Sequence, residues 1–226
     1  MSTKADIQTG RCIVSLDDAG MPTYKIDEVA AFDEITPPAT PLSDFDVLCF
    51  GTLALRGEDN VRTLGKIISE GSFGELYADL NIRAPFYSSR SIEFCLKIAT
   101  IVKISDEELP TVATSLGIEY TTPESVAREF SLRFPNIRLL IITLGERGSF
   151  CLDASEGRVY RAAAQKATVL STVGAGDSFG AAFLASYIST HDIPKSLHVA
   201  SHVSAYVVTK TEAIPLGSKE VFDSVN

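Results

Sequence analysis

The chain has 226 residues, of which 45% are hydrophobic and 22% charged, and it carries a formal net charge of −9. This apolar content excludes a disordered chain, and the acidic balance argues against a nucleic-acid or anionic-membrane surface. The length suffices for a full core in one domain with a small appendage. No stretch reaches the roughly 20 apolar residues of a membrane span, and the N-terminal residues lack the apolar core of a signal peptide. We therefore expect a soluble, cytoplasmic protein.

The cysteines and histidines give no sign of a metal site or a disulfide framework. The four cysteines stand apart in apolar runs without a CxxC pair: Cys12, Cys49, Cys95 and Cys151. This pattern predicts buried free thiols in a reducing compartment. His198 and His202 are spaced i, i+4 on an expected helix, but no third ligand is evident, so the histidines are interpreted as structural.

The first 35 residues differ in pattern from the rest. Residues 12–16 and 23–26 predict two strands, with a turn at 17–20, so residues 9–33 read as a β-hairpin followed by a loop. The stretch 36–41 contains three prolines and predicts a stiff connector. We expect residues 1–35 to form a β-hairpin appendage and residues 36–226 to form the main body.

In the main body, short apolar runs alternate with helical patterns. Strands are expected at 46–50, 75–79, 100–104 and 138–143, the first of them buried on both faces. Helices are expected at 59–69, 88–99, 106–116, 123–134, from just after Gly176 to 189, and 195–209. Thr122 is the expected N-cap of the 123–134 helix, and residues 149–161 form a hairpin-like stretch. The alternation predicts an α/β fold with a mostly parallel sheet and helices on both faces.

The segment Ser171-Thr-Val-Gly-Ala-Gly-Asp-Ser-Phe-Gly180 joins a glycine-rich turn to the start of a helix. Such a turn exposes unpaired N–H groups at the positive end of the helix dipole, which bind phosphate or a developing oxyanion. Asp177 falls in the first turn, where it can cap the helix or take a proton from an attacking hydroxyl. On these residues alone, a tight turn with an ordinary cap remains the alternative. The glycine spacing does not fit GxGxxG, and no Walker A lysine follows.

Residues 172–179, Thr-Val-Gly-Ala-Gly-Asp-Ser-Phe, resemble the second signature of the ribokinase-like (PfkB) sugar kinases, and in particular of their fructokinase branch. Further segments are similar to that branch in order and approximate spacing: Phe-Gly-Thr-Leu-Ala-Leu-Arg at 50–56, Asp-Leu-Asn-Ile-Arg at 79–83, and the runs 102–109 and 142–148. Residues of the hairpin, including Gly10 and Tyr24, are similar to the lid-proximal hairpin of the family. The resemblance covers essentially the whole chain.

The resemblance implies a three-layer, Rossmann-like fold and transfer of the γ-phosphate of ATP to a hydroxyl of a fructose-like sugar. Asp177 would be the catalytic base, and the amides of Gly174, Ala175 and Gly176 would form the anion hole. Glu108 would help to hold Mg²⁺ through water. The nucleotide would contact Thr143, Gly145, Gly148, Ser201, Ser204 and Ala205. The sugar or the phosphate would contact Asn81 and Arg83.

Each of these residues also fits a plainer role when it is taken singly. Glu108 fits a solvated helix residue, Asn81 a turn residue and Arg83 a surface ion-pair partner. Gly145 and Gly148 fit a simple turn after a strand.

The chain departs from the family pattern in two ways. The first strand, the acidic sugar-binding residue and the Gly-Gly-Asn segment of family members are absent, so we expect residues 1–35 to be a lid remnant and the sheet to have an exposed hydrophobic edge. Ser171 stands where the fructokinase branch has aspartate, which makes K⁺ activation doubtful. An impaired kinase fragment or a pseudokinase that binds nucleotide or a partner is therefore the alternative to an active kinase. Lid hairpins of the family often pair between subunits, so a homodimer is possible.

Overall fold

The computed structural model describes residues 7–16, 22–40 and 42–226, so the turn predicted at 17–20 lies outside the described residues. The first part of the chain forms β1 (Cys12–Leu16), β2 (Pro22–Ile26), η1 (Ala31–Asp33), β3 (Phe45–Phe50), η2 (Leu53–Leu55), α1 (Glu58–Glu70), β4 (Phe73–Asp79), α2 (Ser89–Ile98), β5 (Ile101–Ser105) and α3 (Leu109–Ser115). The second part forms α4 (Pro123–Arg133), β6 (Leu139–Thr143), η3 (Gly145–Arg147), β7 (Ser149–Asp153), β8 (Arg158–Ala162), α5 (Ala175–Thr190), α6 (Ile193–Val207) and α7 (Ser218–Val225).

A six-stranded sheet in the order β3-β4-β5-β6-β7-β8 carries the main body. Strands β3 to β6 are mutually parallel, while β7 and β8 are added antiparallel. The mostly parallel sheet predicted from the alternation is thus confirmed. The strand predicted at 46–50 is also present, but its predicted burial on both faces is wrong. Because β3 lies at the edge of the sheet, Phe45 is 51% exposed, and the expected hydrophobic edge is found here.

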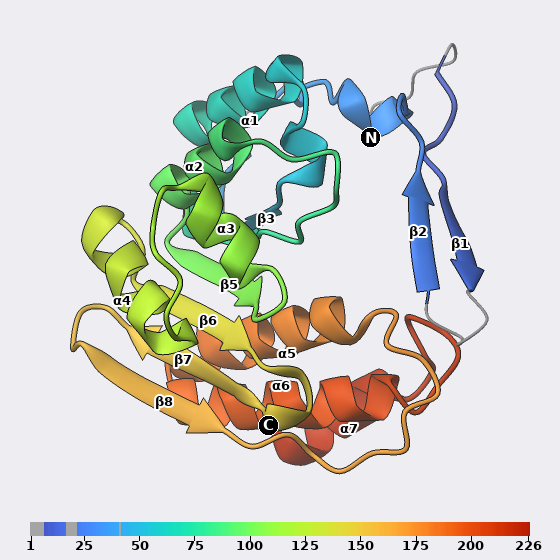
Figure 1. The fold of residues 1–226 in the computed structure, drawn as a ribbon, viewed down its shortest axis with the longest axis vertical. Coiled ribbons are helices and arrows are strands. Elements are labelled where there is room, and N and C mark those ends of the chain that lie inside the picture. Colours follow the sequence, from blue (N-terminus) through green and yellow to red (C-terminus); the bar gives the residue numbers. More distant parts are fainter. Residues whose placement is uncertain (1–6, 17–21, 41) are drawn as a thin grey trace.

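Helices cover both faces of the sheet (Figure 1). Helices α1 to α4 pack on one face in a core that includes Ile92 and Phe130, and α5 to α7 pack on the other around Phe183. Strand β6 serves both cores, because Leu140 faces the first and Ile141 the second, as the two-residue period of a strand requires. This is the predicted three-layer arrangement.

Local capping explains where the helices begin. The N–H of Ser125 donates to Oγ1 of Thr122 over 3.2 Å, so α4 starts at Pro123 as predicted. Helix α3 starts at Leu109, three residues later than predicted, because residues 106–108 form a turn that ends at the N-cap residue Glu108. Helix α7 was not predicted.

The hairpin β1–β2 is antiparallel and separate from the six-stranded sheet. It stands beside the helices and sheet of the main body (Figure 1). All four cysteines are free, but only Cys95 and Cys151 are buried. The predicted burial of Cys12 and Cys49 is wrong, because these residues lie on the hairpin and on the edge strand β3. Among the described residues, no helix has the length and apolarity that crossing a membrane requires.

Candidate active site

The glycine-rich turn leads directly into α5, which starts at Ala175, slightly earlier than predicted. Gly174 is the N-cap residue with a φ of 84°, and a Cβ at this position would lie 2.5 Å from the carbonyl oxygen of Ala213. Both the left-handed backbone and this close approach require glycine. The 16-residue helix therefore directs the positive end of its dipole to the turn.

Two of the three amides expected in the anion hole are available. The N–H of Ala175 donates to the carbonyl oxygen of Thr172 over 3.2 Å. The N–H groups of Gly174 and Gly176 donate to no acceptor within the described part of the chain. Unpaired amides at a helix N-terminus form an anion-binding site.

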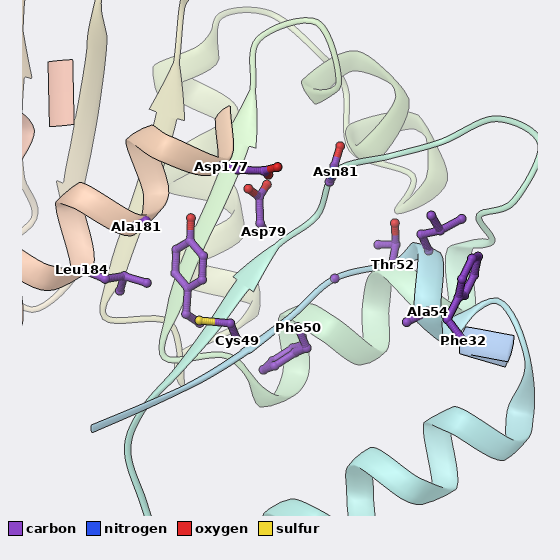
Figure 2. A pocket seen from close by; sticks show the side chains of 13 residues that line it. Phe32, Cys49, Phe50, Thr52, Ala54, Asp79, Asn81, Asp177, Ala181 and Leu184 are labelled. Carbon is purple, nitrogen blue, oxygen red and sulfur yellow. The ribbon is translucent and has the colours of Figure 1, made fainter. Parts of the chain in front are cut away.

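A pocket of about 470 Å³ lies beside this helix end. Asp177 from the first turn of α5, Asp79 from the end of β4 and Asn81 just beyond it line the pocket, and the carboxylates of Asp177 and Asp79 point toward one another (Figure 2). Phe32 and Leu184 belong to its apolar wall. The pocket therefore brings two of the predicted site residues, Asp177 and Asn81, together.

A buried ion pair joins Asp79 and Lys103 next to the start of α5. Nζ of Lys103, a residue only 5% exposed, lies 2.7 Å from Oδ2 of Asp79. Burial raises the pKa of Asp79, Lys103 opposes this rise, and Asp177 adds to it. A Cβ on Gly176 would lie 3.4 Å from Nζ of Lys103, so the ammonium group lies next to the first turn of α5. Oδ1 of Asp79 is buried with no hydrogen-bond partner in the described structure.

Sequence reasoning gave Asp79 and Lys103 no role. The available signal was a lysine inside the apolar run Ile101-Val-Lys-Ile104, because a charged residue in a buried strand normally needs a partner.

Glu108 links the loop after Asn81 to the start of α3. Its Oε1 accepts a hydrogen bond from the N–H of Ile82 over 2.5 Å, and its Oε2 accepts from the N–H and Oγ of Ser105, each over 2.9 Å. Oε1 keeps a lone pair, which fits a water-mediated role beside Mg²⁺, an ion that retains several waters and uses few carboxylates. Within the described residues, no group of three or more metal-binding side chains is found.

The residues predicted to contact nucleotide lie outside the pocket of Asp177. Thr143 ends β6, and Gly145 and Gly148 flank the turn that follows; Gly148 has a φ of 93°. Oγ of Ser204 donates to the carbonyl oxygen of Ala175 over 3.1 Å and so ties α6 to the start of α5.

Two further predicted nucleotide residues lie on α6, and Arg83 and Ser171 lie in loops. Oγ of Ser201 is buried and donates to the carbonyl oxygen of Leu197, while Ala205 is half-buried. Arg83 is exposed and does not line the pocket. Oγ of Ser171 accepts from the N–H of Val173 over 3.2 Å, so this hydroxyl stabilises the turn before α5.

The sequence pattern of the pfkB family of carbohydrate kinases matches residues 1–219. The chain therefore belongs to the pfkB family of carbohydrate kinases.

Among known relatives, the chain is 41% identical to a 5-dehydro-2-deoxygluconokinase of Bacillus subtilis over 80 residues, which are 34% of this chain and 24% of that protein. The match thus spans about a quarter of the length of that relative. The chain is also 30% identical to the putative fructokinase-8 of Arabidopsis thaliana over 149 residues, which are 61% of this chain and 67% of that protein.

Solved structures confirm the ribokinase-like fold. Ribokinase from Thermotoga maritima aligns with a TM-score of 0.76 at 18% identity, over 97% of this chain and 70% of that one. Aminoimidazole riboside kinase from Salmonella enterica, complexed with aminoimidazole riboside and an ATP analogue, aligns with a TM-score of 0.75 at 19% identity, over 98% of this chain and 75% of that one. Fructokinase from Vibrio cholerae, in a form with bound fructose, ADP and calcium ion, aligns with a TM-score of 0.74 at 18% identity, over 95% of this chain and 73% of that one.

Proposed function

We propose that the chain transfers the γ-phosphate of ATP to a hydroxyl of a fructose-like sugar, with Asp177 as the base. The observation that carries this proposal is that the carboxylate of Asp177 shares one helix end with the unpaired amides of Gly174 and Gly176. A proton acceptor and an anion site are two of the groups that phosphoryl transfer to an alcohol uses. Membership of a carbohydrate kinase family supports the same reaction class.

In this proposal the sugar occupies the pocket next to Asp177, which accepts the proton of the attacking hydroxyl. The amides of Gly174 and Gly176 stabilise the negative charge on the transferred group, and the ammonium of Lys103 adds to the positive potential there. The amide of Ala175 joins them if it exchanges its hydrogen bond to Thr172.

The roles of the remaining site residues are proposals of the same kind. Glu108 would hold Mg²⁺ through water, and the bound ion would supply positive charge to the phosphate oxygens. Thr143, Gly145 and Gly148 would lie along the nucleotide phosphates. The adenine end would lie near Ser201, Ser204 and Ala205. Asn81 and Arg83 would contact the sugar or the phosphate.

A second candidate function is nucleotide binding without turnover. The hydrogen bond from Ala175 to Thr172 favours it, because one of the three anion-hole amides is already occupied. The two functions differ in whether ADP is released when sugar is present.

An assay of ADP release with ATP, Mg²⁺ and fructose tests the proposal, with Asp177→Asn as the variant. We expect turnover to fall by about 10²-fold or more, because the amide cannot accept the proton, while ATP affinity stays within a few-fold. Asp223→Asn, at an exposed position on α7, is the matched control and keeps full activity. ATP binding without turnover in the unmodified protein supports the second function. Equal turnover in Asp177→Asn and the unmodified protein rules out Asp177 as the base.

A further inference from the structure

Arg56, the last residue of the 50–56 segment, is a buried guanidinium at the margin of the pocket. Its Nε and Nη2 donate to Oδ1 and Oδ2 of Asp33, each over 2.5 Å, and its Nη1 donates to the carbonyl oxygen of Asp27 over 3.1 Å. The side chain of Arg56 is 10% exposed. A forked, two-bond pair of this kind is among the strongest that an arginine forms, and lysine cannot reproduce its geometry.

Two aromatic rings also pack on this guanidinium. Its Cζ lies 4.9 Å from the ring centroid of Phe32 and 4.5 Å from that of Phe86, within cation–π range. Phe32 lines the pocket, and Phe86 lies on the loop that follows Asn81 and Arg83. One side chain therefore holds two separate stretches of chain, 27–33 and 81–87, against each other.

The shifts in pKa favour the charged forms of both Arg56 and Asp33. Burial raises the pKa of Asp33, but the hydrogen bonds from Arg56 and from the N–H of Ala30, together with the charge of Arg56, outweigh burial and leave this pKa lowered. The hydrogen bond to Asp33 raises the pKa of Arg56. Both groups thus stay ionised at neutral pH.

The backbone next to Phe32 has a second, independent anchor. Nδ2 of Asn60 donates to the carbonyl oxygen of Phe32 over 2.6 Å, and Oδ1 of Asn60 accepts from the N–H of Ile35 over 2.8 Å. A change at Arg56 therefore loosens the Phe32 ring and the 81–87 loop without releasing the backbone near residue 32.

We propose that Arg56 is a positioning residue for the sugar side of the pocket. It fixes the position of the Phe32 ring relative to the loop that carries Asn81. This ring lies across the pocket from Asp177 (Figure 2). This inference rests on the proposed function, because it takes the pocket to be the sugar site. Its consequence is selective: Arg56 determines how well the sugar is held, whereas the amides of α5 and the nucleotide residues lie elsewhere.

The test is Arg56→Lys, with Arg62→Lys as the matched control. Arg62 is 68% exposed and pairs with Asp59 on the surface of α1. We expect Arg56→Lys to raise the KM for fructose about tenfold or more and to leave kcat and the KM for ATP within about twofold. This split is expected because the lost interaction stabilises the bound sugar equally in the ground state and in the transition state. Asp33→Asn is expected to give the same split. An unchanged KM for fructose, or a parallel change in all three constants, overturns the inference.

Hydrogen exchange separates this inference from the proposed function. Without ligand, the amides of 83–87 are expected to exchange faster in Arg56→Lys than in Arg62→Lys, because this loop loses its contact with the guanidinium, whereas the backbone near residue 32 keeps its anchor at Asn60. In the unmodified protein, millimolar fructose is expected to slow this exchange, and the effect is expected to weaken in Arg56→Lys. Fructose protection without turnover contradicts the kinase proposal but keeps Arg56 as the positioning residue. Absence of fructose protection in the unmodified protein overturns the inference itself.

Discussion

Lys103 lies between Val102 and Ile104 in the buried part of β5, and its ammonium group pairs with Asp79 beside the first turn of α5. Removing one partner of a buried ion pair leaves the other charge without compensation. We expect Lys103→Met to lower the free energy of unfolding by about 3 kcal/mol at pH 7, measured by urea denaturation.

The pH dependence of this loss is a check on its cause. The pKa of Asp79 is already raised by burial, and it rises further once Lys103 is gone. A carboxyl with a raised folded-state pKa binds its proton more readily in the folded state, so stability falls as pH rises through the window above about 3.9. The loss in Lys103→Met is therefore expected to be smaller at pH 4.5 than at pH 7. A loss below about 1 kcal/mol at pH 7 would contradict the pairing.

At the residue scale, the sequence predicted the groups that stand in one local motif. Gly174, Gly176 and Asp177 are neighbours in the chain, so their placement at one helix end follows from the turn and the helix period. The pairs Asp79–Lys103 and Arg56–Asp33 join residues far apart in sequence, and they depend on strand register and loop packing. The local pattern indicates that Lys103 needs a partner, but it does not show which residue that partner is.

At the scale of elements, the capping residues predicted where a helix begins, whereas the apolar pattern did not predict how deeply a strand is buried. Thr122 and Pro123 located the start of α4, whereas the turn at 106–108 resembled the first turn of a helix because its acidic residues favour both. Strand β3 has the apolar pattern of a central strand but lies at an edge. Periodicity shows that a strand forms, while its position depends on which neighbours it has.

The cap of α6 gives a test at this scale. Oδ1 of Asp192 accepts from the N–H of Lys195 over 2.8 Å, and α6 packs along α5, the helix that carries Asp177. We expect Asp192→Ala to lower the free energy of unfolding by about 1 kcal/mol, measured by urea denaturation, because a first-turn amide loses its acceptor. Asp223→Ala on α7 is the control, and its loss is expected to stay within about 0.5 kcal/mol. Equal losses in the two variants would show that the cap contributes nothing.

For the whole molecule, the sheet edge formed by β3 is the feature with the clearest consequence. Phe45 is 51% exposed there, and its ring lies 6.4 Å from that of Phe73 on β4. An exposed, apolar edge strand is a template for pairing with another chain. We expect concentration-dependent association in sedimentation velocity, and we expect Phe45→Lys to reduce it, because a charged residue on an edge opposes pairing.

The matched control is Leu132→Lys, which replaces a 79% exposed apolar residue on α4. It is expected to leave association unchanged. If both lysine variants reduce association equally, general surface hydrophobicity is responsible and the edge is not.

Within residues 7–16, 22–40 and 42–226, the strands β1 and β2 pair with each other and not with the six-stranded sheet. A lone two-stranded ribbon is marginally stable in water, because it lacks a third strand or a helix to cover its faces. Its amide protons should therefore be the first to lose protection in dilute denaturant, well before those of β5 and β6. For the same reason, a molecule that binds to the hairpin β1–β2 is expected to slow deuterium uptake first in these two strands. They contribute little to the stability of the main body.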